Sequence, residues 1–333
     1  MKHWKETADV LSRVLRLAEA GRKAAVATVV RIEGSAYRRP GAKFLVEDEG
    51  GTAGSISGGC LEADVREVAL EVMRSGVPRL LRYETGGDDA SVFSLGLGCS
   101  GTVEIFVQSA TSPKALEPVR EILELLQGDR AFSVATAISG EAAGRVRVLA
   151  PGVAAEREAS SDVFVEALEP PPHVLVFGAG DDAIPICTYA SEAGFRVTVV
   201  DHREAALSKE RFPGAFRLIS RRSDEGLEGL PAGPRTLAVA KTHSFAHDRE
   251  WVRRLLSAGV PYIGLLGPRA RGAKLLSQVG VTESDRIFTP VGLDLGAEGP
   301  EQVAIAIVAE LLAVHSSRQP ESLREKEGAI HAR

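Results

Sequence analysis

The stretch HVLVFGAGDDAIPICTYASEAGFRVTVVDHR, residues 173–203, decides the fold of the second half of the chain. A short apolar run ends in Gly178-Ala-Gly180, a helical segment follows, and Asp201 closes the next apolar run 21 residues after Gly180. Glycines at such a turn let a pyrophosphate approach backbone N–H groups at a helix N-terminus, and the acid can accept hydrogen bonds from ribose hydroxyls. The spacing therefore predicts a Rossmann-type nucleotide-binding topology.

The pattern continues beyond this stretch. Short apolar runs alternate with helical segments, which predicts a doubly wound parallel sheet; these runs lie at 216–220, 236–240 and 262–266. We place the Rossmann-type domain at 172–315, with its last helix at 300–314. The charged tail at 316–333 has almost nothing to bury and is expected to be disordered.

The pattern of helical and strand-like segments in the first half predicts an α+β domain at residues 1–150. The pattern does not determine the order of the strands in its sheet. Thr7 is the expected N-cap of a first helix at 7–20. Polar residues 150–162 and the prolines at 170–172 place a linker at 151–171. Further strands are expected at 24–32, 43–48, 102–108, 131–138 and 145–149, and helices from Leu61 onward and at 115–127.

Composition excludes several classes of protein. The 333 residues are 44% hydrophobic and 26% charged, which is typical of a globular chain, and the net charge of −5 offers no basic face for nucleic acid. No uncharged apolar run approaches the length of a membrane span, and the N-terminus has no signal core. Three cysteines suit a reducing compartment, so we expect a cytoplasmic protein with free thiols.

The Rossmann loop is unusually acidic. Asp181 and Asp182 stand where a phosphate would dock, so a diphosphate would need a metal ion, a protonated acid or a cation such as Arg203 or Arg269. Alternatively, the two aspartates only favour the helix dipole.

The loop after the fourth apolar run carries His243, which is either an acid–base or ligand-contacting group or an ordinary exposed histidine. Asp248 is expected to cap the helix that follows.

The stretch SISGGCLE at 55–62 places Gly58, Gly59 and Cys60 at the start of a helix. Backbone N–H donors there would favour a thiolate and could hold an anion. Alternatively, Cys60 is a small buried hydrophobic residue, as free cysteines commonly are.

Two further cysteines need interpretation. Cys99 lies in a second glycine-rich stretch, GLGCSG, and could face the same site as Cys60. The two lack the spacing of a zinc site, so no metal site is expected. Cys187 is expected to pack on an apolar helix face.

These motifs resemble the XdhC/CoxI family of molybdenum hydroxylase accessory factors. The matching segments run through nearly the whole chain in the order of that family. They are GSAYRRPGAKFLV at 34–46, GSISGGCLEADV at 54–65, GLGCSGTVEIFV at 96–107, FGAGDDAIPI at 177–186, VTVVDHR at 197–203, THSFAHD at 242–248, YIGLLGPRARGAKLL at 262–276 and PVGLDLGAEGPEQVAIAIVAELLA at 290–313.

The resemblance implies an accessory factor that binds the molybdenum cofactor (molybdopterin) as cargo, protects it, assists its sulfuration and delivers it to a molybdenum hydroxylase apoenzyme. A cysteine desulfurase is then a candidate partner, and a homodimer is the expected assembly. Cys60 and Cys99 match the two glycine–cysteine motifs of the family, and Asp182 and Asp201 match a variant of its Rossmann segment. The residues around Cys60 that match are Arg38, Arg39, Gly58, Gly59 and Glu62.

Three hypotheses follow. The first is a cofactor-binding chaperone with little turnover of its own. The second is an NAD(P)-dependent oxidoreductase that uses Gly178, Gly180 and Asp201, with His243 as a proton donor. The third is a scaffold whose Rossmann unit has lost its ligand and serves dimerisation or docking.

Overall fold

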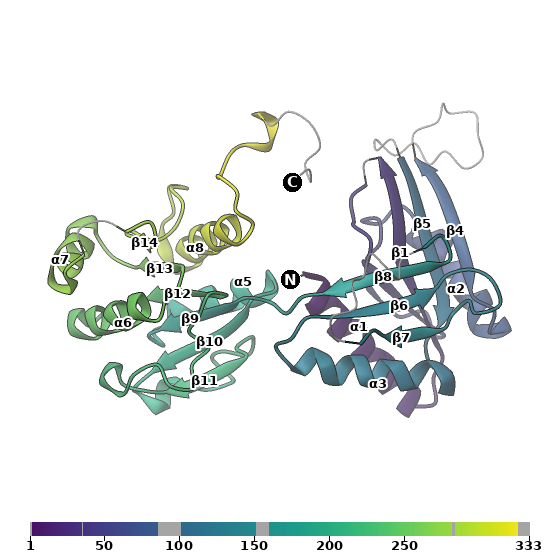
Figure 1. Ribbon diagram of the computed structural model, residues 1–333, viewed down its shortest axis with the longest axis horizontal. Helices are drawn as coiled ribbons and strands as arrows, with labels where there is room; N and C mark the ends of the chain where they lie inside the picture. Colours follow the sequence, from purple (N-terminus) through teal and green to yellow (C-terminus); the bar gives the residue numbers. More distant parts are fainter. Residues whose placement is uncertain (1, 35, 86–100, 151–159, 282–283, 326–333) are drawn as a thin grey trace. The chain divides into compact units, whose positions relative to one another are not determined.

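The computed structural model describes residues 2–34, 36–85, 101–150, 160–281 and 284–325. The chain forms two compact units, Met1–Pro170 and Pro171–Arg333. Antiparallel sheets build the first unit and a parallel sheet builds the second (Figure 1). The predicted α/β class, with a Rossmann-type second half, is confirmed.

The first unit is organised around a five-stranded antiparallel sheet in the order β3-β2-β1-β5-β4. The sequence pattern predicted β1, β2 and β5 but missed the two edge strands, β3 and β4, which are short or carry several charged residues. The strand bounds are β1 Ala24–Gly34, β2 Lys43–Glu47, β3 Thr52–Gly54, β4 Arg79–Thr85 and β5 Gly101–Ser109.

Side chains alternate between the two faces of this sheet, as the pleat requires. Ala25, Ala27 and Val29 of β1 pack in the core beneath helix α2 (Glu62–Ser75). Ala24 and Val26 pack on the opposite face, in a core that includes residues of α1 (Lys2–Glu19) and α3 (Pro113–Gln127). Helices thus cover both faces of the sheet.

Helix α1 begins at Lys2, more than a turn earlier than predicted. Trp4 explains the extension, because its indole Nε1 donates to the Leu126 carbonyl over 3.2 Å and its ring meets Phe132 edge-on at 5.6 Å. Thr7 is therefore a buried mid-helix residue, 2% exposed, and its assignment as the N-cap is wrong. Packing against distant residues determined where this helix starts.

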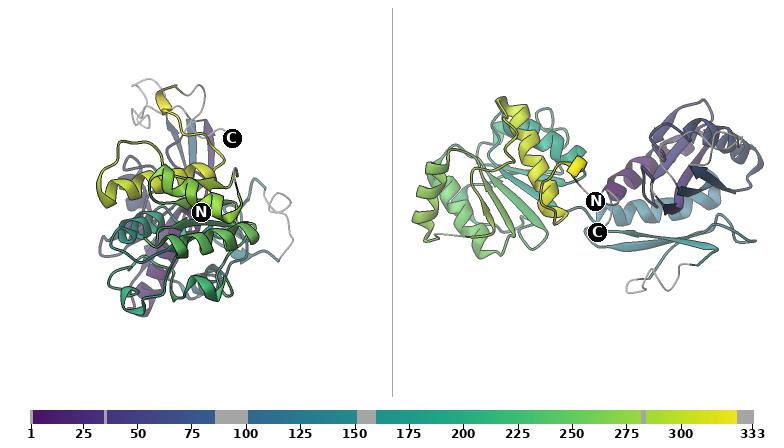
Figure 2. Two further views of the ribbon diagram at one scale, coloured as in Figure 1. Left: turned by 90° about the vertical axis from the view of Figure 1, so that its left-hand side faces the viewer. Right: turned by 90° about the horizontal axis from the view of Figure 1, so that it is seen from above.

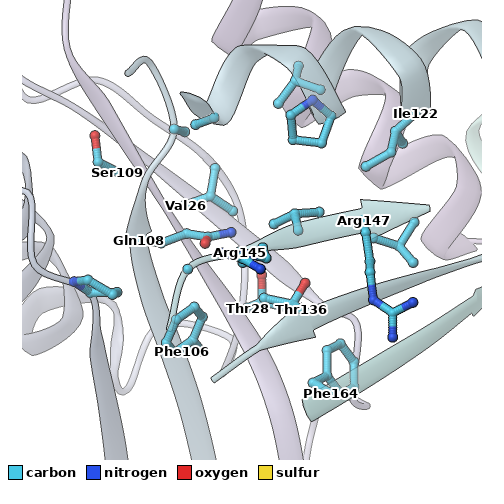
Figure 3. Close-up of a pocket in the computed structure, with 18 of the residues that line it drawn as sticks. Val26, Thr28, Phe106, Gln108, Ser109, Ile122, Thr136, Arg145, Arg147 and Phe164 are labelled. Atoms are coloured by element: carbon cyan, nitrogen blue, oxygen red, sulfur yellow. The ribbon is translucent and has the colours of Figure 1, made fainter. Parts of the chain in front are cut away.

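A second, three-stranded sheet completes the first unit in the order β7-β6-β8. Its strands are β6 Phe132–Ala137, β7 Val146–Val148 and β8 Val163–Leu168. The segment expected to be a linker, 151–171, therefore contains a strand, β8, that pairs along the whole of β6. A cavity of about 730 Å³ lies within this unit and is lined by both sheets and α3 (Figure 3).

The second unit contains a six-stranded parallel sheet in the order β11-β10-β9-β12-β13-β14. The chain runs outward from β9 through β10 to β11 and then crosses back to place β12 on the other side of β9, so β9 and β12 flank the switch point where ligands of such sheets bind. The strands are β9 His173–Phe177, β10 Arg196–Asp201, β11 Arg217–Ser220, β12 Thr236–Ala240, β13 Tyr262–Leu265 and β14 Ile287–Phe288.

Two helical layers enclose this sheet (Figure 2). Helices α5 (Ala183–Glu192) and α8 (Gly299–His315) pack together, and α6 (Phe245–Ser257) packs beside α7 (Arg269–Val279). Cys187 of α5 is 1% exposed, which confirms its packing role, and burial raises the pKa of its thiol to about 11. No helix among the described residues is long and apolar enough to cross a membrane.

Gly178 brings the end of β9 against the loop that follows β12. Its φ of 110° lies in the left-handed region, and a Cβ there would come within 2.6 Å of the Lys241 carbonyl oxygen. Glycine is therefore required here by a neighbouring backbone, independently of any ligand.

We expect Gly178→Ala to lower the free energy of unfolding by at least about 2 kcal/mol, because the new methyl group meets a backbone atom that cannot rotate away. Urea unfolding measures the change. Gly233→Ala is the matched control, since its Cβ would meet nothing within 4 Å and its φ is ordinary. Equal stability of the two variants would contradict this account of the turn.

Candidate functional site

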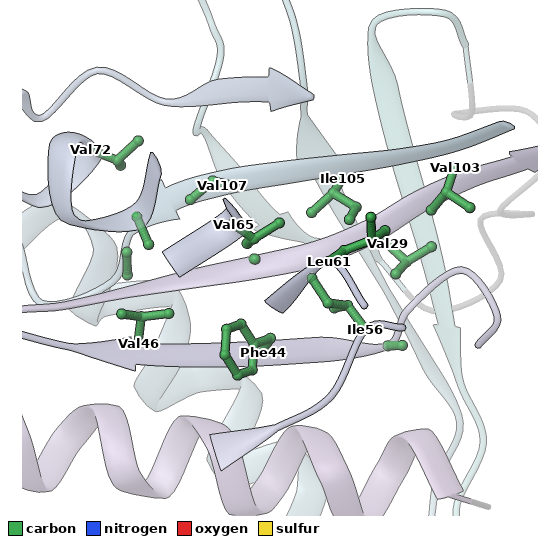
Figure 4. Close-up of a cluster of buried hydrophobic side chains, with 14 of the residues drawn as sticks. Val29, Phe44, Val46, Ile56, Leu61, Val65, Val72, Val103, Ile105 and Val107 are labelled. Atoms are coloured by element: carbon green, nitrogen blue, oxygen red, sulfur yellow. The ribbon is translucent and has the colours of Figure 1, made fainter. Parts of the chain in front are cut away.

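The glycine–cysteine loop, residues 55–61, joins β3 to α2 and is anchored by two apolar side chains. Ile56 and Leu61 are each 2% exposed and belong to the core beneath α2 (Figure 4). The neighbouring loop, residues 36–42, packs Ala36 against the same core. Its Tyr37 ring lies 3.1 Å from the position that a Cβ on Gly58 would occupy. The two loops therefore form one surface.

The carboxylate of Glu62 organises the glycine–cysteine loop. Its Oε1 accepts hydrogen bonds from the backbone N–H groups of Ile56 at 3.1 Å and Ser57 at 3.0 Å, and its Oε2 accepts from Gly59 at 2.9 Å. The hydroxyls of Ser55 and Ser57 also donate to it. A carboxylate at the first position of α2 is favoured by the helix dipole as well.

These hydrogen bonds have two consequences. Burial alone would raise the pKa of Glu62, but the donors from Ser57, Ser55 and Ile56 lower it to about 2. The sequence analysis assigned the backbone N–H donors of this loop to an anionic guest. In the structure these donors are engaged by the carboxylate of Glu62. Glu62 is thus a structural acceptor that shapes the loop around Cys60.

Cys60 is exposed at the surface of this loop. Gly58 and Gly59 precede it with φ of 84° and 118°, conformations that favour glycine and turn the chain outward before the helix. Its side chain makes no hydrogen bond with any residue that the structure describes. The alternative that Cys60 is a buried hydrophobic residue is therefore wrong. Cys99 lies outside the described residues.

The two arginines of the neighbouring loop have different surroundings. Arg38 is 11% exposed at its side chain and forms an ion pair with Glu6 of α1. The same carboxylate accepts the Lys43 N–H at 2.7 Å, so Arg38 belongs to a partly buried network that joins helix and sheet. Arg39, in contrast, is exposed.

In the Rossmann unit, Asp182 folds back over Gly180. Its Oδ1 lies 2.6 Å from the position of a Cβ on Gly180, which is the side from which a pyrophosphate would approach. The same oxygen is 2.7 Å from the ammonium of Lys241, whose side chain is fully buried. Burial would raise the pKa of Asp182, but the hydrogen bond and charge of Lys241 hold it below its usual range.

The neighbouring acids are also paired. Arg211 lies 2.7 Å from Asp181, and Arg203 lies 2.8 Å from Asp201. The cations that face the acidic loop are thus Lys241 and Arg211, whereas the sequence pointed to Arg203 and Arg269. Arg269 begins α7.

Asp201 holds the Rossmann turn to the end of β10. Its Oδ2 accepts the Ala179 N–H at 2.7 Å, and its Oδ1 accepts the Arg203 N–H at 2.8 Å. Burial would raise its pKa, but these donors and the Arg203 guanidinium hold it well below its usual range. The acid expected to contact a ribose therefore already has protein partners.

His243 lies beside the same acidic loop. Its side chain is 68% exposed, its Nε2 is 3.3 Å from Asp182, and its φ of 59° is in the left-handed region. Asp248 does not cap α6 as expected. The N-cap is Ser244, and Asp248 is buried, where it accepts from the Thr242 N–H at 2.9 Å and pairs with Arg271 at 2.7 Å.

Sequence reasoning missed Lys241, although the signal was present: a lysine directly follows an apolar strand at the switch point. Among the described residues, no group of His, Cys, Asp and Glu side chains could hold a metal ion.

Comparison with known proteins matches both units to one family. Residues 17–84 match the XdhC and CoxI family, and residues 174–311 match the XdhC Rossmann domain. A Bacillus subtilis (strain 168) protein, described as a probable xanthine dehydrogenase subunit, is 32% identical over 318 residues, covering 89% of this chain and 94% of that protein. The molybdenum cofactor insertion chaperone PaoD of Escherichia coli (strain K12) is 36% identical over 105 residues, 32% of each chain.

A solved structure with similarity over nearly the full length is among the matches. A Bacillus halodurans protein, described as a xanthine dehydrogenase, superposes with a TM-score of 0.79 and is 28% identical. The match covers 95% of this chain and 98% of that one, so both units take part in the likeness.

We expect Glu62→Gln to lower the free energy of unfolding by about 1–2 kcal/mol at neutral pH, because an amide satisfies the loop donors less well than a carboxylate. Glu71→Gln, on an exposed position of the same helix, is the matched control.

The contribution of Glu62 to the free energy of unfolding depends on pH in a direction that follows from its pKa. The pKa of Glu62 is lowered from 4.5 to about 2 on folding, so its contribution is complete above pH 4.5 and is lost as the pH falls toward 2. Urea unfolding of the wild type and of Glu62→Gln should therefore converge at low pH. A stability gap that does not narrow below pH 4.5 would show that the charge of Glu62 is not responsible.

Proposed function

This chain belongs to the XdhC and CoxI family, and on that premise we propose that it is a maturation factor that binds the molybdenum cofactor as cargo and delivers it to a xanthine dehydrogenase-like apoenzyme. The function for which PaoD is named, insertion of this cofactor, supports the role. The xanthine dehydrogenase name of the Bacillus subtilis relative supports a molybdenum hydroxylase as the recipient.

The observation that carries the proposal is the exposed Cys60 thiol on a loop whose shape is fixed by Glu62. A thiolate is a good ligand for a soft metal centre. A loop that is already satisfied by an internal carboxylate needs no guest in order to fold, so it can present the thiol before and after the cargo leaves. Binding and release then leave the protein unchanged, as a carrier requires.

The charged residues of the two neighbouring loops have further roles in this proposal. Exposed Arg39 suits the phosphate of the cargo, whereas Arg38 and Glu62 position the two loops through Glu6 and through the backbone of residues 56–59. Cys99 is the second thiol of the proposal. A cysteine desulfurase supplies sulfur to the cofactor while it is held, and two copies of the chain form the carrier.

The dinucleotide alternative meets a physical obstacle. The carboxylate of Asp182 occupies the approach to Gly180, and Asp201 is engaged by Ala179 and Arg203. A diphosphate would have to displace the carboxylate of Asp182, and a ribose next to it would have to compete with the protein partners of Asp201. We therefore propose that the Rossmann unit of this chain does not serve hydride transfer, and that His243 contacts Asp182 rather than a nicotinamide substrate.

The thiol proposal predicts that Cys60→Ala weakens binding of the molybdenum cofactor at least about tenfold, since a coordinating group is lost. The full-length protein is mixed with cofactor released from a molybdoenzyme, and bound cofactor is measured after gel filtration. Activation of a xanthine dehydrogenase apoenzyme is the second readout.

Cys187→Ala is the matched control, because that thiol is buried and the variant should retain both activities. Cys99→Ala tests the second thiol. Wild-type affinity and full apoenzyme activation by both Cys60→Ala and Cys99→Ala would remove the thiols from the mechanism.

The Rossmann interpretation predicts that calorimetric titration of the wild type with NADH gives no binding up to about 1 mM. Asp182→Ala should bind at least about tenfold more tightly, because the phosphate approach opens and Lys241 loses its anion. Asp181→Asn is the control, since its exposed carboxylate does not cover Gly180. Micromolar binding of NADH by the wild type would contradict the proposed role of Asp182.

A further inference from the structure

Helix α8 carries an apolar side that stays exposed in the described part of the chain. The helix packs on α5, and its residues Ile307 and Leu311 are fully buried. On another side Ile305 is 51% exposed and Leu312 is 37% exposed, with the half-buried Ala309 between them. Spacings of four and three residues place these three side chains on one face, which we call the outer stripe.

The outer stripe carries no charge, because the acid of this helix faces inward. From Gln302 to Val314 the only charged residue is Glu310. Its carboxylate accepts a hydrogen bond from the Tyr262 hydroxyl at 2.5 Å and another from the Gly292 N–H at 3.0 Å. A helix at the surface normally presents charged and polar residues to water, whereas a helix that is apolar on every side is normally covered. The outer stripe therefore calls for a partner.

The charges at the two ends of α8 indicate which partner fits. Glu298 and Glu301 lie at the start of the helix, and both are exposed. Beyond its last turn lies the exposed Arg318, whose N–H donates to the Ala313 carbonyl at 2.9 Å and so holds this residue beside the helix. A second α8 in the antiparallel direction places each acidic end next to a basic end, whereas a parallel one places like charges together. The charges thus favour a second copy of this helix, in the antiparallel direction.

We propose that two copies of the chain associate through their α8 helices, antiparallel about a two-fold axis near Ala309. This inference names the contact of the two-copy carrier and rests on that part of the proposed function. A two-fold axis repeats each contact, so Ile305 of either copy packs against Leu312 of the other. The small side chain of Ala309 at the axis lets the two helices approach to about 8–10 Å, the usual distance between packed helices.

The test measures the dissociation constant of the full-length dimer by sedimentation equilibrium. Ile305→Glu should raise this constant at least about a hundredfold, because each of the two symmetric contacts then sets a charge against an apolar side chain. Leu125→Glu is the matched control, since Leu125 is also an exposed apolar residue of a helix, α3, and lies in the other unit. This control should dissociate as the wild type does.

A charge exchange tests the direction of the two helices. Glu301→Lys should raise the dissociation constant about threefold to tenfold, because a cation then faces the basic end of the other copy twice. Arg318→Glu, added to Glu301→Lys, should return the constant to that of the wild type. Tighter association of Glu301→Lys alone would indicate parallel helices and would overturn the antiparallel arrangement.

Three results overturn the proposed contact. A dimer that Ile305→Glu leaves intact, or that Leu125→Glu dissociates equally, removes α8 from the contact but keeps the two-copy carrier. A wild type that stays monomeric at about 100 µM removes both; if Ile305→Glu then also abolishes apoenzyme activation, the outer stripe belongs to the recipient enzyme. Cys60→Ala should dimerise as the wild type does, so failure of the thiol site is distinguishable from failure of this contact.

Discussion

The first unit depends on an internal carboxylate that completes the hydrogen bonding of a glycine-rich loop. Backbone N–H groups that converge on one point need an acceptor, and Glu62 supplies it from the first residue of the adjoining helix. The loop therefore has a fixed shape with no ligand bound. Its apolar anchors, Ile56 and Leu61, attach it to the core, so the exposed thiol between them stands on a rigid base.

The second unit uses the same principle at its Rossmann turn. Asp201 accepts from the Ala179 N–H, and Asp182 lies over Gly180 with a fully buried lysine as its counter-charge. In both units the protein's own anion stands where an external anion could be held. This ion pair is costly to break, because removal of Asp182 would leave the charge of the buried Lys241 desolvated. The Rossmann turn is thereby held closed in the structure.

The two faces of the five-stranded sheet divide the first unit between two surfaces. The loop with Cys60 is anchored in the core of one face, and the cavity around Gln108 opens on the other. Both depend on the period of two in β1 and β5, whose alternate residues reach opposite sides. The sheet lies between the two surfaces, and its strand β5 contributes residues to each.

The sequence by itself determined the parallel sheet of the second unit, its glycine turn, and the positions of Cys60 and Asp201, because strand period, turn chemistry and motif spacing are local properties. Tertiary structure alone decided the rest. The edge strands β3 and β4, and β8 within an expected linker, carry weak local patterns and exist through pairing. The contacts of Trp4 determined where α1 starts, and Lys241 pairs with Asp182, which is 59 residues away in the chain. Such partners are chosen by packing and charge in three dimensions, which a linear pattern does not encode.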